Sequence, residues 1–330
     1  MRRVLVVGAG SIGERHLRCF QRTGRCAVQV CDSNRELLET VSERYGISER
    51  FTDISAALNA GTGAAIICTP AHLHVPMAAE CVRKEVPVLI EKPLSTGLKG
   101  VAELRSATLR RKVAVSVAYV HRANPIFSAF REAVQSGRFG IPVEVVATAG
   151  QHFPHYRPAY REIYYRDRST GGGAVQDALT HLANALEWVV GPVRELVADL
   201  DHQVLEGVEV EDTVHVLTRH ARGVMGSLQL NQHQAPNEFI LTVHCTKGSV
   251  RLELHENRWR WMEHPQTPWN DALGVPLERD DLFIRQAHAF LDTCETGRAP
   301  LCSLEEGEQS LRFNLGVLES AQKRAWVTLT

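Results

Sequence analysis

The first 120 residues alternate between two hydrophobic patterns. Short continuous apolar runs predict strands that are buried on both faces, and the segments between them carry apolar residues at helical spacing. The predicted strands are 4–7, 27–31, 64–68, 86–90 and 113–117, and the helices include 34–44, 72–83 and 97–111. Such alternation predicts a doubly wound parallel sheet, whose ligands lie beyond the carboxyl ends of its strands.

The second half of the chain has a different pattern. After a helix at 124–136 and a strand at 143–149, consecutive strands are predicted at 194–200, 213–217, 223–230, 239–244 and 249–254. Strands without intervening helices favour a mainly antiparallel sheet, which leaves one face for helices and the other for a second subunit. Residues 255–280, with three tryptophans and three prolines, are predicted as an irregular loop, and the tryptophans as packing anchors; 282–294 and 304–318 are predicted helices.

These patterns predict an α/β chain of two domains. Residues 1–120 form a Rossmann domain, and residues 121–330 form an α+β domain with an open, mainly antiparallel sheet that assembles a homodimer or homotetramer. A length of 330 residues suits two cores.

A glycine motif stands where the first strand gives way to a helix. Gly8, Gly10 and Gly13 form the GxGxxG pattern that binds a dinucleotide in this setting. The first glycine makes the turn, the second admits the pyrophosphate, and the third lets helix and strand pack closely. The amides of the helix start, at Ser11 and Ile12, point at the phosphates.

Asp32 ends the second strand, 19 residues after Gly13. An acid near this spacing binds the hydroxyls of the adenosine ribose and repels a 2′-phosphate, so NAD is favoured over NADP. Ser33 and Arg35 soften that preference and leave NADP open. The alternative is that Asp32 caps the helix over 34–44.

Two further strand ends carry polar or charged residues. Cys68, Thr69 and Pro70 follow one strand, and Glu91-Lys92-Pro93 follows the next. Lys92 would lie at the cofactor crevice, where a cation can hold a substrate oxygen or help to move its proton; the alternative is a salt bridge at a strand end. The proline also permits a cis peptide bond, which would aim the lysine side chain.

The segment from Gly171 to His181 carries the second candidate site. Three glycines let the backbone approach a neighbour closely, and a helical pattern follows. Asp177 and His181 are four residues apart and share a helix face. An acid beside an imidazole suits a general base; the alternative is a surface helix with a polar face.

Residues 151–170 contain four of the six tyrosines and four arginines. Such a segment can bind a sugar through Tyr156, Arg157 and Tyr160, and arginines suit a carboxylate or phosphate. It can equally be an arm that packs on another subunit, where the same residue types are enriched. Both interpretations stay open, as does a neutral sugar.

Composition narrows the classes of function. A net charge of −1 gives no general attraction to nucleic acid or to an anionic membrane, and no apolar run is long enough for a membrane helix. The eight cysteines include no CxxC pair, which predicts reduced thiols in the cytoplasm and no structural zinc. The histidines show no metal spacing, so no metal site is predicted.

In their order along the chain, the motifs resemble those of the Gfo/Idh/MocA family of nicotinamide-dependent sugar oxidoreductases. The matching residues are Gly8-x-Gly10-x-x-Gly13, Thr69-Pro70 with His74, Glu91-Lys92-Pro93, Arg122-x-x-Pro125, Gly137-x-x-Gly140, and Gly171-Gly172-Gly173 leading to Asp177-x-x-x-His181. One departure is that the glycine usual before the Lys92 strand is replaced in the Lys84-Glu85 region.

The resemblance implies that Lys92, Asp177 and His181 meet over the nicotinamide and share the catalytic and substrate contacts. It adds cofactor contacts from Cys68, Thr69, Pro70, His74, Glu91, Lys92 and Arg122. Two alternatives remain: retained NAD with redox-neutral sugar chemistry, such as glycoside cleavage or epimerisation, and a dinucleotide-dependent regulator without enzymatic activity.

Overall fold

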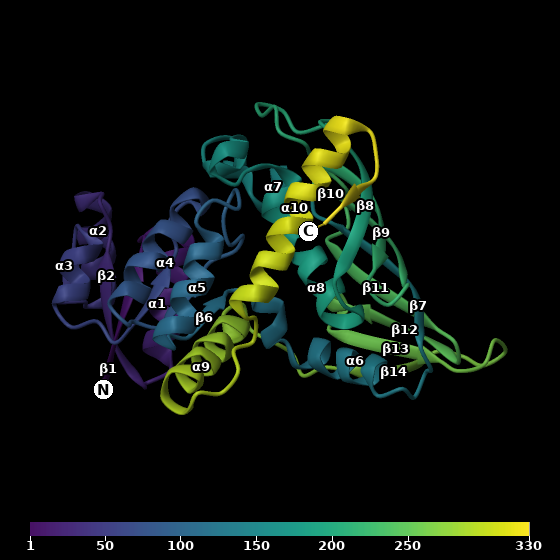
Figure 1. Cartoon of the computed structure of the whole chain (residues 1–330), viewed down its shortest axis with the longest axis horizontal. Helices are drawn as coiled ribbons and strands as arrows, with labels where there is room; N and C mark the ends of the chain where they lie inside the picture. Colours follow the sequence, from purple (N-terminus) through teal and green to yellow (C-terminus); the bar gives the residue numbers. More distant parts are fainter. Residues whose placement is uncertain (330) are drawn as a thin grey trace. The chain divides into compact units, whose positions relative to one another are not determined.

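The computed structural model describes residues 1–329 and divides them into two compact units (Figure 1). The first consists of residues 1–123 and 277–308, and the second of residues 124–276 and 309–329. The division after Ala123 lies near the predicted boundary at 120. However, residues 277–308 return to the first unit, which the sequence prediction placed in the second domain.

The first unit contains a six-stranded parallel sheet in the order β3-β2-β1-β4-β5-β6. Its strands are β1 (Arg2–Val7), β2 (Cys26–Cys31), β3 (Arg50–Phe51), β4 (Ala64–Ile67), β5 (Val88–Ile90) and β6 (Val115–Val117). This order is that of a doubly wound dinucleotide-binding sheet, so the predicted fold is confirmed. The sequence pattern missed only the two-residue β3.

Helices surround this sheet. They are α1 (Ser11–Arg22), α2 (Arg35–Tyr45), α3 (Ile54–Asn59), α4 (His74–Arg83), α5 (Val101–Arg111) and α9 (Asp281–Thr296). α9 belongs here because it packs on α1: the Phe20 and Phe290 rings meet edge to face at 6.2 Å, and Arg18 binds the Asp280 carboxylate at 2.6 and 2.8 Å.

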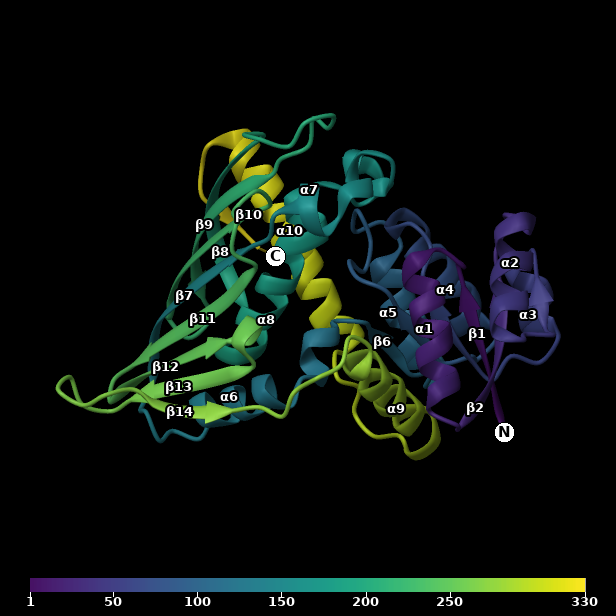
Figure 2. The ribbon, with the colours of Figure 1, turned by 180° about the vertical axis from the view of Figure 1, so that it is seen from behind.

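The second unit contains a nine-stranded sheet in the order β14-β13-β12-β11-β7-β10-β9-β8-β15 (Figure 2). Its strands are β7 (Pro142–Gly150), β8 (Val193–Asp201), β9 (Thr213–His220), β10 (Met225–Asn231), β11 (Glu238–Cys245), β12 (Gly248–Glu253), β13 (Arg258–Met262), β14 (Asn270–Leu273) and β15 (Val327–Thr328). Only β7 and β10 pair in parallel, so the predicted mainly antiparallel sheet is confirmed.

The predicted irregular loop at 255–280 is wrong in part, because two strands, β13 and β14, lie within it. β13 alternates arginine and tryptophan, which is the period of a strand. The rings of Trp259 and Trp261 lie 4.6 Å apart, and Trp259 is buried in the core, as expected of a packing anchor.

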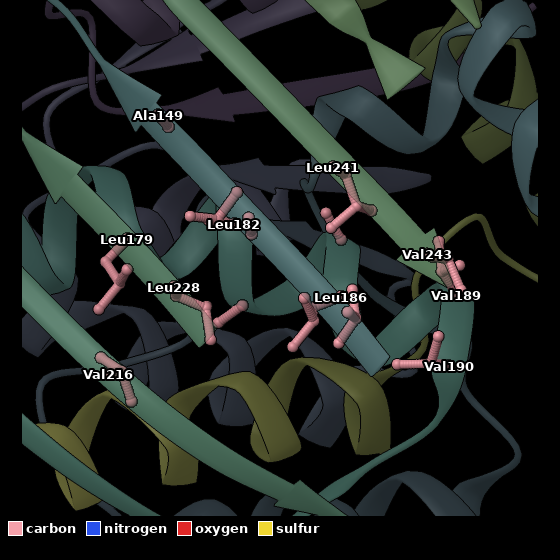
Figure 3. Packing of buried hydrophobic residues seen from close by; sticks show 14 of the residues in the cluster. Ala149, Leu179, Leu182, Leu186, Val189, Val190, Val216, Leu228, Leu241 and Val243 are labelled. Atoms are coloured by element: carbon pink, nitrogen blue, oxygen red, sulfur yellow. The ribbon is translucent and has the colours of Figure 1, made fainter. Parts of the chain in front are cut away.

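One face of the sheet is covered by α6 (Pro125–Gln135), α8 (Thr180–Val190) and the part of α10 (Leu304–Lys323) that belongs to this unit. Figure 3 shows Leu182 and Leu186 of α8 against Leu228 and Leu241 of the strands. Alternation along β9 buries Val214 and Val216 on this face, whereas Leu217 is 53% exposed. No helix within residues 1–329 combines the length and the apolar character that crossing a membrane requires.

Candidate functional site

The glycine loop after β1 has the geometry of a dinucleotide cradle. Gly8 has φ of +96°, and a Cβ there would lie 2.8 Å from the Cys68 carbonyl oxygen. A Cβ on Gly13 would overlap the Gly8 carbonyl oxygen, whereas one on Gly10 would meet no atom within 4 Å. Gly8 and Gly13 are therefore needed for close packing, whereas Gly10 faces open space that fits a pyrophosphate.

Gly10 also leaves the start of α1 without a side-chain cap. The backbone amides of the first turn, which include Ser11 and Ile12, can therefore bind an anionic ligand. The positive end of the helix dipole also favours an anion at this position. The residues present fit the phosphates of NAD.

Asp32 lies beside this loop at the end of β2. Its carboxylate accepts hydrogen bonds from the amides of Ala9 at 2.7 Å and Asn34 at 2.8 Å. The cap of α2 is Asn34, whose side chain accepts from the Leu37 amide, so Asp32 is not the helix cap. Its predicted role toward the ribose stays a prediction.

The segments after β4 and β5 leave the sheet next to each other, because Ile67 pairs with Ile90. The first continues as Cys68, Thr69 and Pro70, and the second as Glu91, Lys92 and Pro93. The Lys92–Pro93 peptide bond is cis, the isomer that the sequence left open.

Glu91 is buried, and its two oxygens have different partners. Oε1 lies 2.6 Å from Nε2 of His16, and Oε2 accepts the amide of Lys92 at 3.0 Å. Burial raises the pKa of Glu91, but the hydrogen bond from His16, the charges of His16 and Lys92 and the Lys92 amide lower it more, so this pKa lies below its ordinary value.

His74 contacts two backbone carbonyls. Nδ1 lies 2.9 Å from the Pro93 oxygen, and Nε2 lies 2.7 Å from the Thr69 oxygen. Both ring nitrogens are thus occupied within the protein. His74 thus joins the two segments that border the cofactor crevice, and its predicted contact with the cofactor stays a prediction.

Arg122 and its neighbour His121 form a turn after β6. The Nη1 atom of the buried Arg122 binds Glu306 at 2.5 Å and the Leu301 carbonyl at 3.1 Å, which anchors the turn to residues near the start of α10. Burial and the charge of Lys92 lower the pKa of His121 to about 4, so His121 is neutral at pH 7. Sequence reasoning missed His121, because a single histidine without spacing carries no signal.

In the second unit, the glycines after Thr170 allow close contacts. A Cβ on Gly172 would overlap the Tyr165 carbonyl oxygen, and one on Gly173, which has φ of +86°, would lie 2.5 Å from Oε1 of Glu211. The Glu211 carboxylate accepts the Val175 amide at 3.1 Å and binds Arg168 at 2.5 Å. Glu211 therefore fixes the start of the helix that follows.

That helix begins with a π-helical segment, Val175–Leu179, and continues as α8. The predicted helix is confirmed, with Asp177 in a π-helical turn, a feature frequent at functional sites. The Asp177 carboxylate is 2% exposed; it accepts from the Tyr164 hydroxyl at 2.6 Å and pairs with Arg157 at 3.2 Å. The charge of Asp177 raises the pKa of Arg157.

Residues 151–170, the tyrosine-arginine arm, pack largely on their own unit. Tyr160 and Tyr165 are each 1% exposed in a cluster with Phe153, Leu205, Val208 and Val210. The Tyr160 hydroxyl donates to the Glu206 carbonyl at 2.8 Å, so Tyr160, predicted to bind substrate, has no ring face to offer a sugar here. Tyr156 is 49% exposed, and Tyr164, which no motif indicated, reaches Asp177 instead.

Two family models match this chain. The model described as "Oxidoreductase family, NAD-binding Rossmann fold" matches residues 2–119, and the model described as "GFO/IDH/MocA C-terminal domain" matches residues 127–251.

Relatives and solved structures match over nearly the whole length. Myo-inositol 2-dehydrogenase of Thermotoga maritima is 22% identical, covering 99% of this chain and 98% of the relative. 1,5-Anhydro-D-fructose reductase of Ensifer adhaerens is 24% identical, covering 97% and 96%. The structure of a levoglucosan dehydrogenase complex with NADH and levoglucosan has a TM-score of 0.90 at 19% identity, with 99% of both chains covered.

The geometry of the glycine loop predicts that alanine at Gly13 lowers the stability of the protein, whereas alanine at Gly10 weakens the binding of NAD. Gly13→Ala should destabilise the protein by about 1–3 kcal/mol, because the new methyl overlaps the Gly8 carbonyl. Gly10→Ala should leave stability within about 0.5 kcal/mol. It should nevertheless weaken NAD binding about tenfold or more, because the methyl fills the space for the phosphates. Thermal unfolding and NADH fluorescence titration measure both, and undiminished NADH binding by Gly10→Ala would contradict the cradle.

Proposed function

The chain belongs to the Gfo/Idh/MocA oxidoreductase family, and we propose that it is an NAD-dependent dehydrogenase or reductase acting on a hydroxyl or keto carbon of a sugar or polyol. The observation that carries the proposal is the edge of the parallel sheet in the first unit. Three features lie at the carboxyl ends of strands there. They are the open space at Gly10 after β1, the carboxylate of Asp32 after β2 and the segment of Lys92 after β5.

The proposed mechanism divides the chemistry between cofactor and protein. Bound NAD supplies the hydride acceptor. His181 takes the hydroxyl proton, and Lys92 binds the same oxygen and stabilises its developing negative charge. Asp177 supports the charged form of His181.

Asp177 is suited to this role because its carboxylate is held in a fixed position. Arg157 and the Tyr164 hydroxyl both bind its buried carboxylate. Together they fix its position, and a carboxylate placed beside an imidazole would stabilise the protonated ring.

The charges of the arm support a neutral substrate. Three of its arginines pair with carboxylates of their own unit: Arg157 with Asp177 at 3.2 Å, Arg161 with Glu206 at 3.4 Å, and Arg168 with Glu211 at 2.5 Å. An anionic substrate would have to compete with these partners. The named relatives, which act on inositol, levoglucosan or anhydrofructose, point the same way.

A substrate screen that follows the absorbance of reduced cofactor tests the function. Neutral cyclic polyols and anhydro sugars should be turned over with stoichiometric NADH release and a preference for NAD over NADP, while uronic acids and nucleotide sugars should react poorly. Turnover of anionic sugars alone would contradict the neutral substrate. Sugar conversion without NADH release would favour redox-neutral chemistry. No turnover, together with a tight NAD-dependent protein partner, would favour a regulator.

Substitution of the proposed catalytic groups should separate chemistry from cofactor binding. Lys92→Met and His181→Ala should each lower kcat by roughly 10²–10⁴-fold, the usual contribution of positioned proton-transfer groups. The Kd for NADH should change less than about threefold. The exposed Lys99 and His264 provide matched controls as Lys99→Met and His264→Ala. Full activity in either active-site variant would reject that residue's role.

We also propose that the open face of the nine-stranded sheet joins two copies of the chain. Val146, Leu217 and Val197 form one row across β7, β9 and β8, in register through Ser227 of β10. They line a shallow cavity of about 420 Å³. Apolar side chains on an uncovered sheet face are typical of a protein interface.

Substitution within this row should change the oligomeric state. The wild-type protein should sediment as a dimer or tetramer, and Leu217→Arg should shift it toward monomer because a charge at the interface centre is costly to bury. Leu109→Arg, at a leucine that is 69% exposed on α5, is the matched control and should leave the assembly unchanged. A monomeric wild-type protein in sedimentation velocity would contradict the interface.

From the state of the cysteines we also propose that the protein is cytoplasmic. Within residues 1–329 the eight cysteines form no disulfide, and six of them are buried. Buried reduced thiols suit the reducing cytoplasm.

A further inference from the structure

The segment that carries Lys92 is held on both sides by buried histidines. We propose that His16 and His74 are positioning residues, which fix the Lys92 segment relative to α1 and to the segment of Thr69. This inference rests on the proposed function, because it assigns these histidines a role in placing the proposed catalytic lysine.

His74 holds the segment on the carboxyl side of Lys92. Its ring lies between the carbonyl oxygens of Pro93 and Thr69, at 2.9 and 2.7 Å, and the side chain is 1% exposed. A neutral imidazole donates from only one nitrogen, so only the protonated ring satisfies both carbonyls. Burial opposes that form and lowers the pKa of His74. In either form the ring sets the spacing between the Thr69 loop and Pro93.

His16 holds the segment on the amino side. It lies on α1, the helix that begins at the glycine loop, and its Nε2 binds Glu91 at 2.6 Å. The other oxygen of Glu91 accepts the amide of Lys92 at 3.0 Å. The His16 ring is 1% exposed and packs edge-on to Phe283 at 5.3 Å. A continuous chain of contacts thus leads from the cofactor helix to the Lys92 backbone.

The two contacts act on successive residues, the amide of Lys92 and the carbonyl of Pro93. Together they fix the backbone from which the lysine side chain extends. A shift of about 1 Å in a reacting group can cost roughly 100-fold in rate, so loss of either contact should be seen in kcat.

The alternative is that these histidines only pack. His220 of the second unit supplies a matched comparison, because it is 3% exposed and also joins two segments. Its Nδ1 lies 2.7 Å from the Gly191 oxygen, and its Nε2 lies 3.2 Å from Oγ1 of Thr218. It differs from His16 and His74 in having no contact with the Lys92 segment among its described hydrogen bonds.

The experiment compares His16→Phe, His74→Phe and His220→Phe in the full-length protein, using the neutral polyol found in the substrate screen. The first two should lower kcat about 10–100-fold, change the KM for polyol and the Kd for NADH less than about threefold, and increase the deuterium isotope effect on kcat. His16→Gln and His74→Gln retain an N–H donor and should recover much of the lost rate. His220→Phe should keep kcat within about threefold at temperatures where it is folded.

Several results would overturn the inference. The first is a kcat within threefold of wild type in the phenylalanine variants at positions 16 and 74. The second is a kcat in the glutamine variants as low as that of the phenylalanine variants. If the phenylalanine variants do not fold, His74→Asn replaces them, because its shorter amide can reach only one carbonyl. A kcat for His74→Asn equal to that of wild type would then reject the role.

Lys92→Met measured in parallel separates this inference from the proposed function. If Lys92→Met is inactive while the histidine variants match wild type, only the positioning role is wrong. If Lys92→Met is as active as wild type, the catalytic role of Lys92 is wrong, and the positioning role falls with it.

Discussion

A carboxylate that folding removes from water must be bound by hydrogen-bond donors or cations, and this requirement organises the functional residues of both units. In the first unit Glu91 is bound by His16 and by the amide of Lys92. In the second unit Asp177 is bound by Tyr164 and Arg157, and Glu211 by Arg168 and the Val175 amide.

Each of these carboxylates connects segments that are distant in the sequence. Glu91 joins α1 to the segment after β5, and Glu211 joins the region before β9 to the start of the helix that carries Asp177. Removing the donors would leave a buried charge without compensation, which is strongly destabilising. The segment that carries Lys92 and the helix start that carries Asp177 are therefore held in place by the donors that compensate these buried carboxylates.

The sequence was most informative where one residue type is needed for a local steric reason. Gly8 and Gly13 permit close backbone contacts that any side chain would prevent, and Gly172 does the same in the second unit, where Gly173 leaves room for the Glu211 carboxylate. Strand periodicity likewise predicted both sheets. Local patterns of this kind depend on neighbours in the chain and so can be read from the sequence.

The sequence was least informative where function depends on distant partners. Tyr164 reaches Asp177 across 13 residues, and His16 reaches Glu91 across 75, without a periodic signal in either case. Tyr160 is a residue type expected in a sugar site, and it lies in a segment rich in tyrosine and arginine. It is nevertheless buried by contacts with residues 205–210, more than 40 positions later in the chain. The return of residues 277–308 to the first unit also depends on tertiary contacts, such as Phe20 with Phe290.

Two helix starts show how the chain distributes negative charge. Gly10 gives α1 no side-chain cap, so the positive end of that helix dipole remains for the phosphates of a cofactor. The helix that carries Asp177 begins instead against Glu211, whose carboxylate takes the Val175 amide and occupies the space beside Gly173. An anionic substrate would meet a helix start that is already neutralised. The start of this helix is therefore occupied by a carboxylate of the protein itself, whereas the start of α1 is left to a ligand.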